Sequence, residues 1–348
     1  MSLKVLTALG GGKLGGAEAF FVSLNLALKS HGVPVHAALR DNPVHTADLA
    51  RAGIPYDTLK FGGPFDVWTS RRLRRMVKHF APDIVLTFAS RASAHMPKGN
   101  YALIGRLGGY YKLRHFRKCD YLVCNAPDLV RYVVDRGWPK DRVVLIPNFP
   151  RIDEGDAIDR SVLGTPEGVP VALALGRLHR NKALDVLLRA AATIPDLWVW
   201  IAGEGVERAS LEVLARDLGI AERVKFLGWR TDRASLFKAA DLCVYPSREE
   251  PFGNVVVEAW AYGAPLVATA AVGPSWLVRD GKDGLLTPVD DPGALAGGIL
   301  RIVSAPDFGR QLAENGKKRV AAEFSEDAVV LAYMDLFEKA RRISARQG

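Results

Sequence analysis

Short apolar runs alternate with longer amphipathic stretches along most of this chain. A continuous apolar run predicts a strand buried on both faces, and an amphipathic stretch predicts a helix. Their alternation predicts parallel sheets covered by helices, the α/β class. The expected strands are residues 3–9, 33–39, 82–88, 101–106, 121–125, 143–146, 169–175, 197–202, 224–227, 242–245 and 266–269. The expected helices are residues 19–29, 70–80, 128–135, 184–192, 209–218, 255–262 and 326–342.

The domain organisation follows from length and from one break in the pattern. A chain of 348 residues with 49% hydrophobic content suits two domains of ordinary size. Residues 151–168 are rich in Asp, Gly and Pro and show little periodicity, which is typical of a linker. We therefore expect a first domain at 1–150, a second at 169–325, and a terminal helix within 326–348.

Two glutamates, Glu250 and Glu258, stand on either side of a turn into a predicted helix. Asn254 suits the N-cap of that helix and places Glu258 on the same face. The backbone N–H groups of Phe252, Gly253 and Asn254 would then point into the mouth of the loop, where carboxylates accept from hydroxyls and amides donate to oxyanions. This chemistry suits a sugar nucleotide. Spacing alone fits two ordinary solvated glutamates equally well, because such a pair often arises by chance.

The residues around the two glutamates are more specific. Glu250-Pro-Phe-Gly, Glu258-Ala and Gly263-Ala-Pro265 closely resemble the E-x7-E signature of retaining glycosyltransferases of family 4, which have the GT-B fold. That fold consists of two doubly wound Rossmann-like domains that face each other across a cleft, with a C-terminal helix that crosses back to the first domain. The second domain binds the nucleotide sugar and the first binds the acceptor.

The resemblance also implies a reaction. A sugar would pass from a nucleoside-diphosphate sugar, of the UDP type, to a saccharide or lipid-linked saccharide, for example in lipopolysaccharide core or other cell-envelope glycan synthesis. It implies no cofactor and no metal, because Arg177 and Lys182 occupy the positions where the family places cations around the donor diphosphate. Glu250 would contact sugar hydroxyls and Glu258 the ribose. No protein nucleophile is expected.

The first domain begins with a glycine-rich loop that allows two interpretations. Gly10, Gly12 and Gly15 match G-x-G-x-x-G between a strand and a helix, and Arg40 follows the next strand, so an NADP-dependent oxidoreductase is one alternative. The family has a similar Gly-Gly-Ala-Glu loop here. The resemblance therefore favours a loop whose Gly15 and Gly16 amides hold the donor.

The chain departs from the family at positions that affect the donor site. Many relatives carry His-x-His at the strand expected to end at Phe88, and this chain has no histidine there; Arg91 or His95 could supply the contact. Trp276 stands where a glutamate usually follows a second glycine loop, and Phe149 replaces a glycine after Pro147-Asn148. A catalytically degenerate GT-B protein that only binds sugar nucleotide is a further alternative.

The charge is concentrated in the first half of the chain. Residues 1–160 hold 24 Lys and Arg against 14 Asp and Glu, whereas residues 161–348 are nearly neutral. This asymmetry suggests an anionic partner, such as a membrane surface or a phosphorylated acceptor, although solvated helix faces explain it equally well. No nucleic-acid module accompanies the charge, so nucleic acid is not expected. Three cysteines without metal spacing, and the lack of a signal peptide or apolar span, predict a cytoplasmic or peripheral membrane protein.

Overall fold

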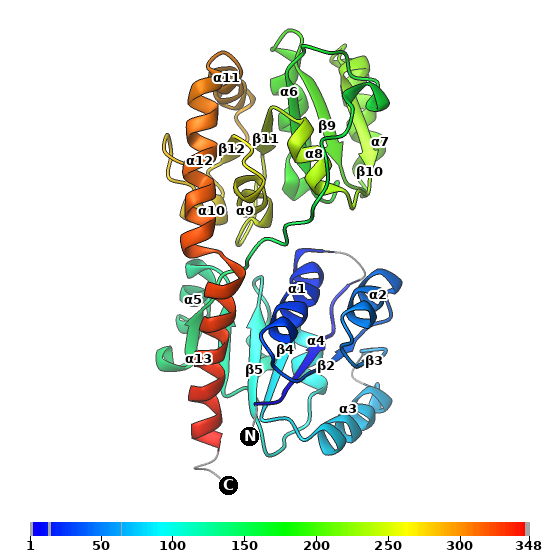
Figure 1. The fold of residues 1–348 in the computed structure, drawn as a ribbon, viewed down its shortest axis with the longest axis vertical. Helices are drawn as coiled ribbons and strands as arrows, with labels where there is room; N and C mark the ends of the chain where they lie inside the picture. Colours follow the sequence, from blue (N-terminus) through cyan, green and yellow to red (C-terminus); the bar gives the residue numbers. More distant parts are fainter. Residues whose placement is uncertain (1–2, 13–14, 64, 345–348) are drawn as a thin grey trace. The chain divides into compact units, whose positions relative to one another are not determined.

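The computed structural model describes residues 3–12, 15–63 and 65–344. Within them the chain forms two compact units. Unit 1 comprises the described residues up to Asn148 and from Glu326 onward, and unit 2 is Phe149–Ser325. Each unit is an α/β domain (Figure 1).

Unit 1 is built on a parallel sheet with the strand order β3-β2-β1-β4-β5-β6-β7. Its central strands are buried along their length, as a sheet covered on both faces requires. The terminal helix contacts β5 and α1, so the chain returns to unit 1 after completing unit 2. The elements are β1 (Val5–Leu9), α1 (Gly16–Ser30), β2 (Val35–Leu39), α2 (Pro43–Arg51), β3 (Tyr56–Thr58), α3 (Val67–Phe80), β4 (Ile84–Phe88), α4 (Ala89–His95), β5 (Ala102–Leu107), β6 (Tyr121–Cys124), α5 (Pro127–Val134), β7 (Val143–Leu145) and α13 (Glu326–Ser344).

Unit 2 repeats this plan with the order β10-β9-β8-β11-β12-β13. Alternate residues of β8 enter two separate cores: Ala172 and Ala174 lie on one face of the sheet, and Leu173 lies on the other. Apolar side chains on both faces explain why this strand is a continuous hydrophobic run. The elements are β8 (Val171–Leu175), α6 (Leu184–Ala192), β9 (Trp198–Ala202), α7 (Arg208–Asp217), β10 (Val224–Gly228), α8 (Arg233–Ala239), β11 (Leu242–Tyr245), α9 (Asn254–Ala261), β12 (Leu266–Thr269), α10 (Val272–Leu277), β13 (Leu285–Thr287), α11 (Pro292–Val303) and α12 (Pro306–Glu323).

Both sheets are doubly wound, and each reverses its strand order at one place. In unit 1 the reversal lies between β1 and β4, and in unit 2 between β8 and β11. Ligands of open α/β sheets bind beyond the carboxyl ends of the strands at such a switch point. The loops after these four strands are therefore where a site is expected. The predicted fold class, two Rossmann-like α/β domains, is confirmed.

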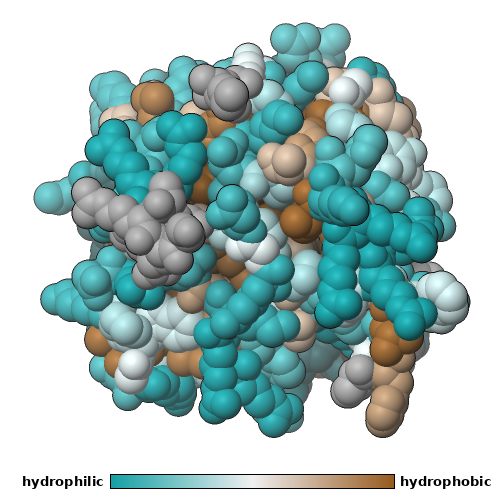
Figure 2. All heavy atoms as spheres, turned by 90° about the horizontal axis from the view of Figure 1, so that it is seen from below, coloured by the Kyte–Doolittle hydropathy of each residue, from teal (hydrophilic) through white to brown (hydrophobic). Residues whose placement is uncertain are grey.

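The surface and the thiols agree with a globular protein. Figure 2 shows a face on which hydrophilic residues predominate and hydrophobic ones are scattered among them. None of the helices in the described residues combines the length and apolar character that crossing a bilayer requires. Cys119, Cys124 and Cys243 are buried free thiols, and burial raises the pKa of both Cys119 and Cys124 to about 12, which leaves them protonated.

The N-terminus of α3 contains a carboxylate that should make the stability of the protein depend on pH in acid. Asp66 caps α3, accepting hydrogen bonds from the Thr69 amide at 3.0 Å, the Thr69 hydroxyl at 2.6 Å and the Gly62 amide at 2.8 Å. The Thr69 hydroxyl, assisted by the backbone bonds, lowers the pKa of Asp66 from 3.8 to about 2. The ionised carboxylate therefore stabilises the fold at neutral pH, and that contribution is lost as the pH falls from 3.8 through about 2.

We expect Asp66→Ala to lower the free energy of unfolding by ~1 kcal/mol at pH 7, the usual cost of losing a cap. The deficit should shrink in acid, because below pH 3.8 the carboxyl of unfolded wild type becomes protonated while the native carboxylate does so only near pH 2. Urea titrations of both proteins between pH 7 and pH 2.5 measure it, with exposed Asp156 changed to Ala as the control. A deficit that stays constant over this range would contradict the assignment.

Candidate functional site

At the switch point of unit 2, a loop that carries a lysine lies next to a loop that carries a glutamate. Lys182 lies in the loop after β8, in a short 3-10 turn, and Glu250 lies in the loop after β11. Because β8 and β11 are adjacent parallel strands, both loops leave the same edge of the sheet. The carbonyl of Asn181 also accepts a hydrogen bond from the Arg248 amide at 2.8 Å, which joins the loops through their backbones.

Lys182 and Glu250 form an ion pair at this edge, and Tyr245 completes the cluster. The Glu250 Oε2 atom accepts from Lys182 Nζ and, at 2.7 Å, from the Tyr245 hydroxyl. The Lys182 and Glu250 side chains are only 19% and 18% exposed. Burial and the neighbouring Glu250 carboxylate raise the pKa of Tyr245 well above its ordinary value, so its hydroxyl remains a donor. Lys182 and Tyr245 also line a small recess, together with Gly176 and Ser247.

Arg248 holds the two loops in this arrangement. Its guanidinium makes a two-pronged pair with Asp185, at 2.9 and 2.7 Å, and donates to the Arg180 carbonyl at 2.8 Å. Its Nε atom also donates to Asp290, so three segments converge on one side chain. Paired bonds from a planar guanidinium restrain orientation as well as distance. Sequence reasoning missed Arg248, because nothing in its local context indicates partners so far along the chain.

We expect Arg248→Gln to raise the KM for the nucleotide-sugar donor predicted from the sequence at least tenfold, because the loops that carry Lys182 and Glu250 lose their common anchor. Loss of the charged hydrogen bonds should also cost ~1–2 kcal/mol of stability. Steady-state kinetics and urea unfolding measure the two effects. Arg189→Gln removes an exposed arginine of α6 and serves as the control. If Arg248→Gln loses this stability but its KM is unchanged, Arg248 stabilises the fold and does not affect donor binding.

The start of α9 differs from the expectation. Gly253, with φ of 106°, is the N-cap, and Asn254 is the first helical residue, so the prediction that Asn254 caps the helix is wrong. The left-handed conformation suits glycine and leaves the cap without a side-chain hydrogen bond. At the other end, Gly263 has φ of 71°, and Ala264 donates to the Ala259 carbonyl at 2.8 Å, which is a Schellman ending.

Glu258 lies one turn into α9 and is largely buried. Its Oε1 atom accepts from Arg233 of α8 at 2.7 Å. Its Oε2 atom is buried and has no hydrogen-bond partner within the described part of the chain. Because a buried carboxylate oxygen without a partner is costly, this atom is suited to accept from the hydroxyl of a ligand.

Phe252 contributes packing rather than side-chain contact with a ligand. Its side chain is 2% exposed, and its ring centroid lies 5.9 Å from that of Trp276 and 6.4 Å from that of Phe324. Only the backbone of Phe252 is available for the predicted role. The Trp276 ring centroid also lies 6.3 Å from that of Phe324, so Trp276 belongs to the aromatic cluster beneath the loop. Gly273 donates to the Glu250 carbonyl at 2.8 Å, in a contact with no space for a Cβ atom.

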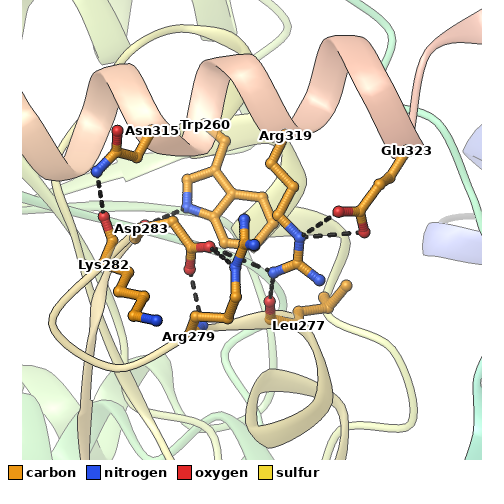
Figure 3. A network of polar contacts seen from close by, with 8 residues as sticks. All are labelled: Trp260, Leu277, Arg279, Lys282, Asp283, Asn315, Arg319 and Glu323. Carbon is orange, nitrogen blue, oxygen red and sulfur yellow. Dashed lines mark hydrogen bonds and ion pairs between the residues drawn. The ribbon is translucent and has the colours of Figure 1, made fainter.

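A buried polar network fixes α9 and the chain after α10 against α12 (Figure 3). Arg319 of α12 donates to the Leu277 carbonyl and to Glu323, and its Nη1 atom lies 3.4 Å from the fully buried Asp283 carboxylate. Arg279 Nε donates to the same carboxylate oxygen, Asp283 Oδ2, at 2.6 Å. Trp260 of α9 donates to the Asp283 carbonyl at 2.6 Å. These contacts therefore fix the position of α9, the helix that carries Glu258.

Arg177 lies in the same loop as Lys182, next to Gly176, and its side chain is exposed. It lies at the carboxyl-end edge of the sheet of unit 2, and its contact with a diphosphate stays a prediction. Arg177, Lys182, Glu250 and the start of α9 all belong to unit 2, whereas the remaining predicted site residues, Gly15, Gly16, Arg91 and His95, belong to unit 1.

Contacts with α4 and with the first turn of α1 fix the conformation of the glycine loop of unit 1. A Cβ atom on Gly10 would lie 2.6 Å from the Ala92 amide nitrogen, so glycine is required for close contact with α4. Glu18 accepts from the Gly12 amide at 2.7 Å and thereby ties the loop to the first turn of α1. Gly15 is the N-cap of α1, which begins at Gly16. Lys13 and Leu14 of this loop lie outside the described residues.

His95 and Arg91 both lie in α4, after β4. The His95 ring nitrogens lie 3.2 Å from the Ser70 hydroxyl of α3 and 3.3 Å from the Gly62 carbonyl, so they hold α4 against α3 and against the segment before it. The Arg91 side chain is exposed. A donor-sugar contact for either residue stays a prediction, and the observed partners of His95 favour a structural role.

The chain matches two families of known sequences. Residues 14–153 match the family described as Glycosyltransferase Family 4, and residues 156–319 match Glycosyl transferases group 1. The lipopolysaccharide core biosynthesis glycosyltransferase LpsE of Rhizobium meliloti is 37% identical over 93% of this chain and 96% of its own length. LpsD of the same organism is 35% identical over 94% of this chain and 96% of its own length.

A solved structure shares the fold. Anabaena Alr3699/HepE in complex with UDP superposes with a TM-score of 0.83 at 21% identity, covering 97% of this chain and 100% of that one. At this level of identity the similarity concerns the fold alone.

Proposed function

The chain belongs to the group 1 and family 4 glycosyltransferases, and from that membership we propose that unit 2 binds a UDP-type sugar at the carboxyl ends of β8 and β11. The observation that carries the proposal is the buried cluster of Lys182, Glu250 and Tyr245 at the switch point. Family membership also removes the basis of the oxidoreductase alternative, because residues 14–153, which include Gly15 and the helix after it, match a glycosyltransferase family.

Each group at the site has a role in transfer. Lys182, with Arg177 in the same loop, stabilises the negative charge that accumulates on the departing diphosphate. Glu250 accepts from sugar hydroxyls, and the unpartnered Oε2 atom of Glu258 accepts from the ribose. The backbone amides of Gly253 and its neighbours donate to donor oxygens. Cationic side chains at the diphosphate supply the charge that a divalent metal provides in other transferases, so we propose that no metal is required.

The proposed reaction retains the anomeric configuration. The bond between the anomeric carbon and the diphosphate oxygen breaks, and a bond to the acceptor oxygen forms on the same face of the sugar. The acceptor hydroxyl gives its proton to the departing phosphate oxygen, which is the basic group closest to it. This route needs no protein nucleophile, and Glu250 serves in binding and orientation.

The acceptor is proposed from the relatives. LpsE and LpsD are named as lipopolysaccharide core glycosyltransferases, and each aligns over nearly its whole length with this chain. We therefore place this protein in the synthesis of a lipopolysaccharide core or a related envelope glycan, acting on a saccharide or lipid-linked saccharide.

Donor titration followed by thermal unfolding tests the proposal. UDP-sugars are expected to raise the stability, by roughly 2.7 kcal/mol at a hundred times the dissociation constant, whereas NADP should not. The stabilising donor is then incubated with truncated lipopolysaccharide, and the anomeric coupling of the product reports retention. Transfer should persist in EDTA. Stabilisation by NADP alone, or an inverted product, would contradict the proposal.

A contact with an anionic membrane surface is proposed for unit 1. Phe65, Val67 and Trp68 are 95%, 54% and 70% exposed at the start of α3, and the Arg71 guanidinium lies 5.5 Å from the Trp68 ring. Aromatic side chains next to arginines suit the headgroup region of a bilayer. Co-sedimentation with phosphatidylglycerol vesicles at low salt should weaken severalfold in Trp68→Ser. Equal sedimentation of the two proteins would exclude this surface.

A further inference from the structure

Unit 1 contains a buried arginine whose surroundings are unusual for a charged group. Arg106 of β5 is 2% exposed. Its guanidinium carbon lies 4.3 Å from the Phe20 ring centroid and 5.1 Å from that of Phe88. The Nε atom donates to the Tyr333 hydroxyl of α13 at 3.1 Å, and Nη2 donates to the Asn148 side chain. In the described part of the chain, none of these partners carries a negative charge.

Arginine stays protonated in proteins, and a buried charge without a counter-charge is strongly unfavourable. The aromatic rings and neutral acceptors around Arg106 offset only part of this cost. The third nitrogen, Nη1, makes no hydrogen bond within the described residues. A Cβ atom built on Gly108 would lie 3.4 Å from Arg106 Nη1, so this nitrogen faces the space above Gly108.

The same space is bordered by Asn125. The sheet register pairs Leu107 of β5 with Cys124 of β6, so Gly108 and Asn125 are the next residues along two neighbouring strands. Asn125 Nδ2 lies 3.9 Å from the Cβ position of residue 108. The Asn125 side chain is 3% exposed, and its Oδ1 atom is buried without a partner among the described residues. Buried amides are normally fully hydrogen-bonded. The unpartnered Oδ1 atom accepts only from a donor, such as a sugar hydroxyl, whereas Nδ2 is the atom that donates to an anion.

We propose that the space above Gly108, between Arg106 Nη1 and Asn125 Nδ2, binds an oxyanion of the acceptor, a sugar-linked phosphate or carboxylate. This site lies beyond the carboxyl ends of β5 and β6, the edge where α/β sheets bind ligands. It deepens the proposed function and rests on it, since it specifies an acidic acceptor for the transferase. Gly108 is partly exposed, which gives the ligand access, while the guanidinium behind it remains enclosed.

Adjacent glycines provide a matched pair of variants. A methyl group at Gly108 occupies the space and meets only ordinary contact distances, so Gly108→Ala should fold. A methyl group at Gly109 lies 3.9 Å from the Tyr111 ring, and Gly109→Ala is the control. Asn125→Asp places a carboxylate beside the guanidinium, and this variant should be more stable than the wild type while repelling anions. If Asn125→Asp is less stable than the wild type, the premise that Arg106 lacks a nearby negative charge is contradicted.

Binding is measured by calorimetry with inorganic phosphate, glucose 6-phosphate, glucuronate and glucose, in saturating UDP so that the donor site is occupied. We expect the phosphate-bearing probes or glucuronate to bind wild type and Gly109→Ala with equal affinity. Gly108→Ala and Asn125→Asp should bind the same probes at least tenfold more weakly. The probe that binds identifies the kind of anion. Equal anion affinities in Gly108→Ala and Gly109→Ala, or no anion binding by the wild type, would overturn the proposal. UDP binding, titrated separately, tests the transferase assignment independently.

Discussion

Replacing Lys182 by alanine is expected to reduce the turnover of sugar transfer by roughly 10²–10³-fold, the usual effect of removing one preorganised group that stabilises developing negative charge. Lys182 is fixed by Glu250 and lies 3.2 Å from the Tyr245 hydroxyl, so its ammonium is held at the switch point before the donor arrives. Because the charge on the diphosphate grows as the bond breaks, kcat should fall more than the affinity for donor.

Arg180→Ala is the matched control, since it removes an exposed cation from the same turn without altering the backbone carbonyl that Arg248 binds. Initial rates at several donor concentrations separate the effects on kcat and KM. A Lys182→Ala enzyme with wild-type kcat would remove Lys182 from the reaction, and an equal loss in Arg180→Ala would reduce the effect to general loss of positive charge.

Arg319→Leu is expected to cost about 3–5 kcal/mol of unfolding free energy, the typical penalty for removing one partner of a buried ion pair. Asp283 has a fully buried side chain, and it would lose one of its two guanidinium partners. The Arg319 guanidinium also lies 5.3 Å from the Trp260 ring centroid, so a contact beneath α9 is lost as well. Urea denaturation measures the change.

Arg310→Leu makes the same substitution on the same helix, where the arginine is 70% exposed, and should change stability by less than about 1 kcal/mol. A similar small change in Arg319→Leu would show that the network in Figure 3 does not support α9. If Arg319→Leu loses much stability but binds the donor with normal affinity at low temperature, the network stabilises the fold and does not position the donor site.

The fold was predictable because its central strands are buried on both faces. Such strands are continuous apolar runs, and β11 and β12 occur at the expected bounds. The edge strand β3 (Tyr56–Thr58) was missed, since its three residues are partly exposed and carry no pattern. Helices α2, α4 and α8 were also missed, because short segments contain too few turns for a periodicity to emerge.

The site was only partly predictable. Lys182 and Glu250 were identified through their resemblance to family motifs, and the structure pairs them. Arg248 and Arg106 gave no signal, because the role of each depends on partners that only the fold brings close. Asn254 was misassigned as a cap, since a glycine in the left-handed region can serve at that position without any side-chain hydrogen bond.

A crystal structure of the complex with UDP would show directly whether Lys182 and Glu258 bind the nucleotide. We predict a diphosphate oxygen within hydrogen-bonding distance of Lys182 Nζ, about 2.7–3.2 Å, and a ribose hydroxyl at Glu258 Oε2. A nucleotide bound only at the Gly10–Gly16 loop, with the pair of Lys182 and Glu250 undisturbed and distant from it, would contradict the account.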